Sequence, residues 1–160
     1  MQIGEKMKIT DIEKNLSIEL PQEYKQLLDK IDDFIYILHN ENPEDFPDDE
    51  GTPWFFWGED RLFEEVEIEG STTKPAWQQL ISYAEIDKKY RKRTSLPSNK
   101  GEMDFLHLER SVSIAEDNGD ILYIDTASSN SIWIYMHTSG EARMIANSFK
   151  EWIENSVIEE

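Results

Sequence analysis

The Asn118-Gly119 pair constrains the fold more than any other feature of the sequence. It separates two runs rich in β-branched and aromatic residues, 112–114 and 121–124, and a third such run follows at 132–136. An Asn-Gly pair between two apolar runs is the strongest short-range signal for a tight turn that joins antiparallel strands. The sequence therefore predicts an antiparallel sheet in the C-terminal half of the chain, with a hairpin at this pair.

Helical patterns open the chain. Apolar residues recur at helical spacing over 9–16, and Thr10 and Glu13 have the spacing of a capping box, which predicts a helix that begins at Thr10. Pro21 suits the first position of a second helix, whose apolar stripe extends to residue 31. Both stripes are typical of helices that cover a core.

The chain closes on another helical pattern. It begins near Ser148, and Glu151 stands at the position that completes a capping box. The apolar spacing predicts a single last helix, which buries Phe149, Trp152, Ile153 and Val157.

Between these helical patterns the sequence alternates between strand-like and loop-like stretches. Apolar and aromatic runs predict strands at 34–38 and 54–57, and residues 40–53, with three prolines among acidic side chains, predict a loop between them. Residues 62–66 fit a short helix and a strand equally well. We predict a helix from Trp77 to Ala84 and a strand over 106–114.

Helices at both ends with strands between them predict an α+β fold, a mostly antiparallel sheet flanked by N-terminal helices and a C-terminal helix. The 160 residues correspond to a single domain, 1–160, which is long enough to bury about 70% of the surface of the unfolded chain. Five Trp, six Tyr and seven Phe supply large side chains for its core. The chain has no cysteine, which excludes disulfides, thiolate nucleophiles and Cys-based zinc sites.

The charge is strongly unbalanced, since 34 acidic and 16 basic side chains give a net charge of −18. Such a field repels the phosphates of nucleic acids and of anionic membranes, and it attracts a basic protein. The alternative is that the acidity only keeps the protein soluble. No apolar signal region follows the first eight residues, and the longest apolar runs are strand-sized. We therefore expect a soluble, cytoplasmic monomer with neither nucleic acid nor membrane as a partner.

No motif for catalysis or metal binding occurs in the sequence. The histidines, His39, His107 and His137, are far apart and each lies beside a strand-like run, which favours structural roles. The acidic turn around Asn118-Gly119 is not an EF-hand loop, because Ile114 stands where the first acidic ligand is required. We expect no catalytic residue, no metal and no cofactor. We interpret the basic run 88–93 as cations that offset local acids at the end of a helix.

Residues 41–69 hold most of the net charge, with twelve acids and one base, Arg61, against six large aromatic residues. One interpretation is a binding surface with aromatic anchors inside an acidic rim. The other places the aromatic residues in the core and the acids on a solvated face. Under the first interpretation Trp54 and Trp57 are exposed anchors, and the acidic partner-binding residues are Glu44, Asp45, Asp48, Asp49, Glu50, Glu59 and Asp60.

Three stretches in a fixed order carry a family resemblance. The first contains Leu20-Pro21 and Tyr24-Lys25 in the predicted helix pair, the second is the predicted hairpin over 112–125, and the third joins Ile132-Trp133-Ile134-Tyr135 to Ser148-Phe149 and Trp152-Ile153. Together they resemble the SUKH superfamily, which contains the Smi-Knr type cell-wall regulators and bacterial immunity proteins.

The resemblance implies a mixed α+β fold with no catalytic residues to carry over. Bacterial members bind and neutralise a cognate toxin, often a nuclease, and eukaryotic members are interaction modules. A nuclease presents cations to its phosphate substrate, so an acidic protein can occupy that surface. Our first hypothesis is an immunity protein with a basic toxin as its partner. The alternatives are a non-catalytic regulatory module of cell-wall synthesis, an acidic mimic of nucleic acid and, last, an enzyme.

Overall fold

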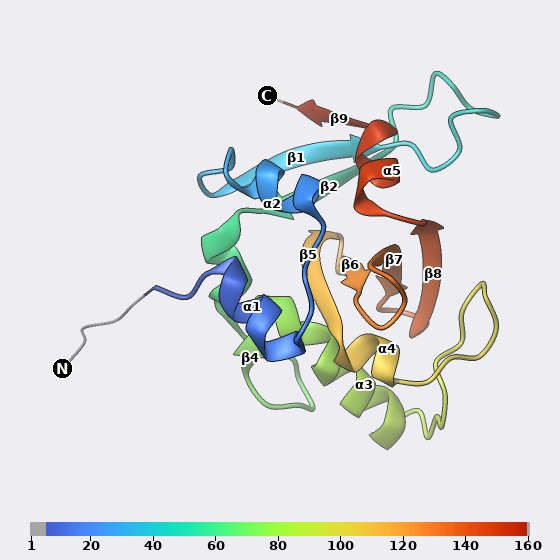
Figure 1. Ribbon diagram of the computed structural model, residues 1–160. Helices are drawn as coiled ribbons and strands as arrows, with labels where there is room; N and C mark the ends of the chain where they lie inside the picture. The colour runs from blue at the N-terminus through green and yellow to red at the C-terminus, as the bar shows by residue number, and fades with distance from the viewer. Residues whose placement is uncertain (1–5, 160) are drawn as a thin grey trace.

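A seven-stranded antiparallel sheet with strand order β8-β7-β6-β5-β2-β1-β9 organises the computed structural model, which describes residues 6–159 (Figure 1). A two-stranded ribbon, β3-β4, lies apart from it. The strands are β1 (Phe34–His39), β2 (Thr52–Trp57), β3 (Glu65–Val66), β4 (Lys74–Pro75), β5 (Ser111–Asp117), β6 (Asp120–Asp125), β7 (Ser131–Met136), β8 (Glu141–Ala146) and β9 (Ser156–Glu159). The helices are α1 (Ile9–Leu16), α2 (Gln22–Leu28), α3 (Gln79–Lys89), α4 (Leu106–Glu109) and α5 (Phe149–Glu154), with short 3-10 helices η1 (Glu59–Phe63) and η2 (Ala76–Gln78). The α+β prediction is confirmed.

The predicted hairpin joins β5 to β6. Asp117 pairs with Asp120, and the two residues between them have positive φ angles, 50° for Asn118 and 92° for Gly119. Two successive positive φ angles define the tight turn whose twist matches that of the flanking strands. The hairpin continues through β7 and β8 as an antiparallel meander.

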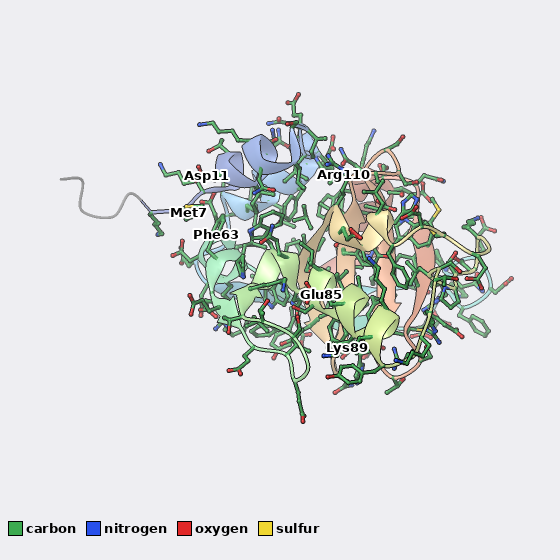
Figure 2. The ribbon with its side chains drawn as sticks, turned by 90° about the horizontal axis from the view of Figure 1, so that it is seen from below. Met7, Asp11, Phe63, Glu85, Lys89 and Arg110 are labelled. Atoms are coloured by element: carbon green, nitrogen blue, oxygen red, sulfur yellow. The ribbon has the colours of Figure 1, made fainter. Side chains whose placement is uncertain are left out.

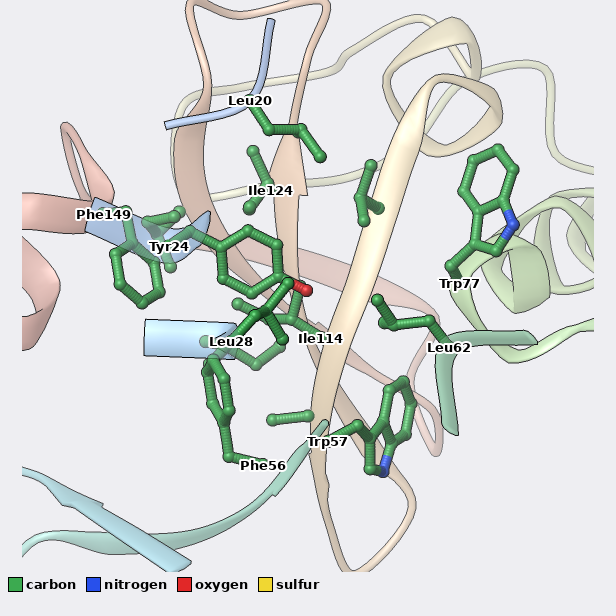
Figure 3. Close-up of a cluster of buried hydrophobic side chains, with 14 of the residues drawn as sticks. Leu20, Tyr24, Leu28, Phe56, Trp57, Leu62, Trp77, Ile114, Ile124 and Phe149 are labelled. Carbon is green, nitrogen blue, oxygen red and sulfur yellow. The ribbon is translucent and has the colours of Figure 1, made fainter. Parts of the chain in front are cut away.

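Helices α1, α2 and α5 cover one face of the sheet. Their side chains pack on inward residues of the strands, and Tyr24 lies near the centre, surrounded by Phe149, Leu28 and Ile114 (Figure 3). The Tyr24 ring meets those of Phe149 and Phe56 edge to face, with centroids 5.4 and 6.1 Å apart. Such aromatic pairs add to the stabilisation from buried area, so this cluster is the main core.

Helices α3 and α4 cover only half of the opposite face. Leu80 of α3 and Leu108 of α4 pack on Tyr123 and Trp133, and Figure 2 shows α3, which carries Glu85 and Lys89, in front of the strands of this half. Figure 1 shows β1, β2 and β9 at the other end of β5 from α3 and α4. No α-helix covers this face of the β9-β1-β2 half within residues 6–159, and Arg61 of the 3-10 helix η1 reaches over part of it.

The start of α1 differs from the prediction. The helix begins at Ile9 with Lys8 as its N-cap, and the Lys8 backbone N–H donates to Asp11 Oδ2 at 2.8 Å, so the Thr10–Glu13 capping box is wrong. Glu13 instead ties the two helices together, because its Oε2 accepts from the Leu20 N–H at 2.8 Å and from Lys25 Nζ at 3.1 Å. Tertiary partners thus decide the role of this carboxylate.

Two further segments differ from the predictions. Residues 106–109 form the helix α4 instead of a strand, because Asp104 Oδ1 accepts the Leu106 N–H at 2.8 Å and starts a helical turn. The last helix ends at Glu154, and Val157 lies in the edge strand β9, which pairs with β1 and leaves this side chain 65% exposed. For residues 62–66 both alternatives hold in part, since η1 ends at Phe63 and β3 begins at Glu65.

The capping box of α5 is present in part. Ser148 Oγ accepts the Glu151 N–H at 3.1 Å, while the Glu151 carboxylate accepts from the Asn147 N–H at 3.3 Å. As predicted, Phe149 and Trp152 are fully buried, and Ile153 is partly buried.

His39 joins β1 to the α5–β9 junction. Its ring stacks on Trp152, with centroids 4.9 Å apart and planes inclined by 17°. The Ser156 hydroxyl donates to the Trp152 carbonyl at 2.7 Å and therefore accepts from Nδ1–H of His39 at 2.8 Å. Burial disfavours the charged ring and lowers the pKa of His39 to about 4.

We expect Trp152→Ala to lower the free energy of unfolding by about 3–5 kcal/mol, because it empties a fully buried site in the main core. Denaturant unfolding measures this loss. Tyr90→Ala is the matched control, since Tyr90 is 59% exposed and its removal should cost about 0.5 kcal/mol or less. A loss below about 1 kcal/mol for Trp152→Ala would show that α5 is not docked as described.

The buried neutral His39 should make stability depend on pH. In the unfolded chain the His39 ring binds a proton near its ordinary pKa of 6.5, whereas in the folded protein it does so only near 4. The contribution of His39 to stability is therefore fully present above pH 6.5 and is lost as the pH falls from 6.5 towards 4. The loss should reach about 3 kcal/mol at most. Unfolding of wild type and His39→Gln at pH 7.5 and pH 4.5 isolates it, because the variant should lose less stability. Parallel pH profiles would contradict this account.

Candidate partner-binding surface

Residues 40–51, which we call the acidic loop, connect β1 to β2 and project past the end of both strands beside α5 (Figure 1). The Asn40 side chain holds the loop together, since its Nδ2 donates to the carbonyls of Phe46 and Asp49, at 2.8 and 3.3 Å. Its backbone N–H donates to the Asn155 carbonyl at 3.1 Å and joins the loop to the end of α5. These hydrogen bonds give the acidic loop a defined conformation.

The carboxylates of the acidic loop point to solvent. Glu41 pairs with Arg143, at 2.5 Å, but no ion pair involves the other five acids within the described residues. Those five are the predicted partner-binding residues Glu44, Asp45, Asp48, Asp49 and Glu50, all of them exposed. Uncompensated charges at one edge of the molecule concentrate its negative field there.

A groove of about 790 Å³ lies between the acidic loop and β9; we call it the loop groove. Leu38, Pro53 and Val157 give it an apolar side. Four carboxylates line it, from Asp49, Glu50, Glu154 and Glu159, and no cationic side chain does so among the described residues. The groove thus combines an apolar surface with charges that are all negative.

Three aromatic rings lie together on the uncovered face of β1 and β2; we call them the outer aromatic cluster. Successive side chains of a strand point to opposite faces of the sheet. Because Ile37 and Phe56 point into the main core, their neighbours Tyr36 and Phe55 point to the opposite face. Phe34 stacks on Phe55 with centroids 4.5 Å apart, and Tyr36 meets Phe55 at 5.6 Å. Phe34 and Tyr36 are 39% and 44% exposed.

Arg61 lies over two rings of this cluster. Its guanidinium carbon is 5.3 Å from the centre of the Phe34 ring and 5.1 Å from that of Phe55. Two hydrogen bonds from the guanidinium to the Asp33 carboxylate, of 2.7 and 3.1 Å, fix its position. These hydrogen bonds raise the pKa of Arg61 and lower that of Asp33.

A second depression, of about 350 Å³, lies where the cluster meets the β5–β6 hairpin; we call it the hairpin hollow. Phe55 faces Glu116 across the β2–β5 pair, and the lining consists of Tyr36, Pro53, Phe55, Glu116, Asp117, Asn118 and Gly119. Pro53 also lines the loop groove, so the two depressions adjoin at this residue. Partial burial, together with the nearby Asp120, raises the pKa of Asp117.

The expectation that Trp54 and Trp57 are exposed anchors is wrong. Trp54 is 1% and Trp57 5% exposed, and Figure 3 shows Trp57 beside Leu62 in the main core. Trp54 points inward by strand alternation, and η1 folds Leu62 against Trp57 at the end of β2. The exposed rings of this surface are those of Phe34 and Tyr36, which the alternation of residues 34–38 could have indicated.

Glu59 and Asp60 do not lie with the acidic loop. They belong to η1, which follows β2, whereas the loop precedes this strand. Glu59 accepts the Ile9 N–H at 2.7 Å, and Asp60 pairs with Lys6 at 2.9 Å. Both therefore hold the N-terminal segment, and the structure divides the predicted segment 41–69 between two ends of β2.

The other two histidines pair with carboxylates at separate places. His107 Nδ1 lies 2.8 Å from Asp125, and His137 Nδ1 lies 2.8 Å from Asp120. Within residues 6–159 no group of three or more His, Asp or Glu side chains could hold a metal ion. We find no described helix with the length and apolarity needed to cross a membrane.

Two cations of the basic run 88–93 pair with local acids within residues 6–159, which confirms part of the prediction. Lys88 pairs with Glu109 at 3.1 Å, and Arg91 pairs with the buried Asp87 of α3 at 2.5 Å. Arg93 donates to the carbonyls of Ser139 and Gly140. Arg91, which also donates to the carbonyls of His137 and Thr138, and Arg93 fasten the end of α3 to the β7–β8 turn.

Comparison with known proteins gives one family match. The sequence model of the SMI1 / KNR4 family (SUKH-1) matches residues 6–155. No curated protein and no solved structure gives a significant match. The match extends from before α1 to the end of α5 and so includes strands β1 to β8, the acidic loop and the outer aromatic cluster, but not the edge strand β9. On this evidence the chain belongs to the SMI1 / KNR4 (SUKH-1) family.

Proposed function

We propose that this protein is an immunity protein that binds a cognate basic toxin, of the nuclease type, and neutralises it in the cytoplasm. Family membership supports a binding role of the immunity or the Smi1-Knr4 regulatory kind. The observation that favours a basic partner is the acidic loop, where five exposed carboxylates without ion pairs border an apolar surface that no described α-helix covers.

Charge and apolar contact have different roles in the proposed binding. The negative field of the loop attracts a cationic surface and speeds the encounter, while buried contacts decide how long the complex lasts. A nuclease needs cations in its active site to hold phosphates. A protein that covers those cations blocks the substrate without any chemistry of its own.

Affinity capture from the native cell tests the function. The protein should retain one basic protein that is toxic when expressed alone and harmless when this chain is co-expressed. Retention of a cell-wall synthesis complex would support the regulatory alternative, and retention of assorted DNA-binding proteins would support nucleic-acid mimicry. Either result would overturn the proposal.

Neutralising the acidic loop should slow binding of the captured toxin. The variant carries Glu44→Gln, Asp45→Asn, Asp48→Asn, Asp49→Asn and Glu50→Gln. We expect its association rate at low salt to fall about tenfold and to depend less on salt, with a smaller change in dissociation rate, because exposed rim charges act mainly on the encounter.

The matched control removes five other exposed acids that have no ion pairs among the described residues: Glu23→Gln, Asp29→Asn, Asp32→Asn, Glu67→Gln and Glu69→Gln. Both variants have the same net charge, so a difference between them reports position and not total charge. Equal association rates for the two variants would show that the acidic loop is only a solvated face.

A further inference from the structure

Arg61 shows how this surface holds a guanidinium group. The group lies over Phe34 and Phe55, and the Asp33 carboxylate accepts two hydrogen bonds from it. A flat cation over aromatic rings with a carboxylate at its edge combines cation–π attraction with a directed ion pair. The chain therefore contains one filled example of an arginine site on its outer aromatic cluster.

The hairpin hollow has the same components without a cation. Phe55 lines it together with a second ring, that of Tyr36, and two carboxylates, those of Glu116 and Asp117. Arg61 gives its two carboxylate hydrogen bonds to Asp33; its charge also interacts with Glu116, but Glu116 makes no ion pair within residues 6–159. The rings and the negative charge are thus present, and the lining of the hollow includes no Lys or Arg side chain.

We propose that the hairpin hollow binds an arginine side chain of the partner protein. The guanidinium lies against Tyr36 and Phe55 and donates to Glu116 and Asp117, while the aliphatic stem packs on Pro53. This site deepens the proposed function, because it assigns to the basic partner one anchor residue and the place where that residue docks.

Size and chemistry favour arginine over other occupants. A hollow of about 350 Å³ is at the lower end of the range for small-molecule sites, and it is open to solvent, which suits one side chain of a larger partner. Arginine stacks on rings and donates two parallel hydrogen bonds, whereas lysine carries a compact, strongly hydrated charge. Arginine is also enriched among the anchor residues of protein interfaces.

A titration with small probes tests the hollow without the partner. N-acetyl-arginine methylamide, its lysine counterpart and its citrulline counterpart, which is neutral and has nearly the same shape, are added to isotope-labelled protein and followed by NMR. We expect the arginine probe to shift the ring signals of Tyr36 and Phe55 and the amide signal of Gly119. Lysine should bind at least threefold more weakly, and citrulline should cause no shift.

Two variants assign the effect to the hollow. The double variant Glu116→Gln, Asp117→Asn should abolish the arginine-dependent shifts, and the five-acid loop variant should retain them. If the double variant is not folded, Asp117→Asn alone should weaken the shifts at least threefold. Equal shifts with arginine and citrulline, or arginine shifts that map outside the hollow, would overturn the proposal.

The captured partner separates this inference from the proposed function. The double variant should dissociate from that partner at least tenfold faster than wild type. If a basic toxin is captured and the double variant releases it at the wild-type rate, the arginine site is wrong and the function stands. If no basic partner is captured, the proposed function fails, and the probe titration alone decides whether the hollow binds arginine.

Discussion

The short pairing between β2 and β5 is the contact that holds the two halves of the sheet together. Only two positions pair, Phe55 with Glu116 and Phe56 with Ala115, yet they join the β9-β1-β2 half to the meander of β5–β8. Phe56 points into the main core, where it packs against Tyr24 and Trp152, while Phe55 points outward. One strand pair thus unites the sheet and also places an aromatic ring beside a carboxylate on its surface.

The uneven cover of the sheet links this fold to its proposed role. A sheet buried on one face alone normally shows polar residues on the other. Here Tyr36, Phe55 and Phe34 remain on the uncovered face, and the acids of the loop, β9 and the hairpin surround them. An exposed apolar patch with a charged border is typical of a binding surface, and the border also limits self-association of a protein with a net charge of −18.

The sequence was informative where local patterns decide the structure. Asn118-Gly119 predicts its hairpin, because few other residue pairs adopt two positive φ angles without strain, and Ser148 predicts the start of α5. Tertiary contacts decided the rest. Residues 54–57 are all aromatic, so the outward direction of Phe55 emerges only from its neighbours in β1 and β5, and Val157 continues the period of α5 although it lies in β9. For the same reason the sequence predicted the acidic loop but not the pairing of Phe55 with Glu116, which are far apart in sequence.

We propose that the uncovered face of β1 and β2, together with the acidic loop, is the surface that meets the partner. NMR cross-saturation from the unlabelled captured partner to the labelled protein tests this proposal, because saturation transfers only to residues in contact. We expect transfer to Tyr36, Phe55 and residues 43–50, with α3 and α4 unaffected. Transfer to α1, α2 or α3 with none to Tyr36 and Phe55 would contradict it.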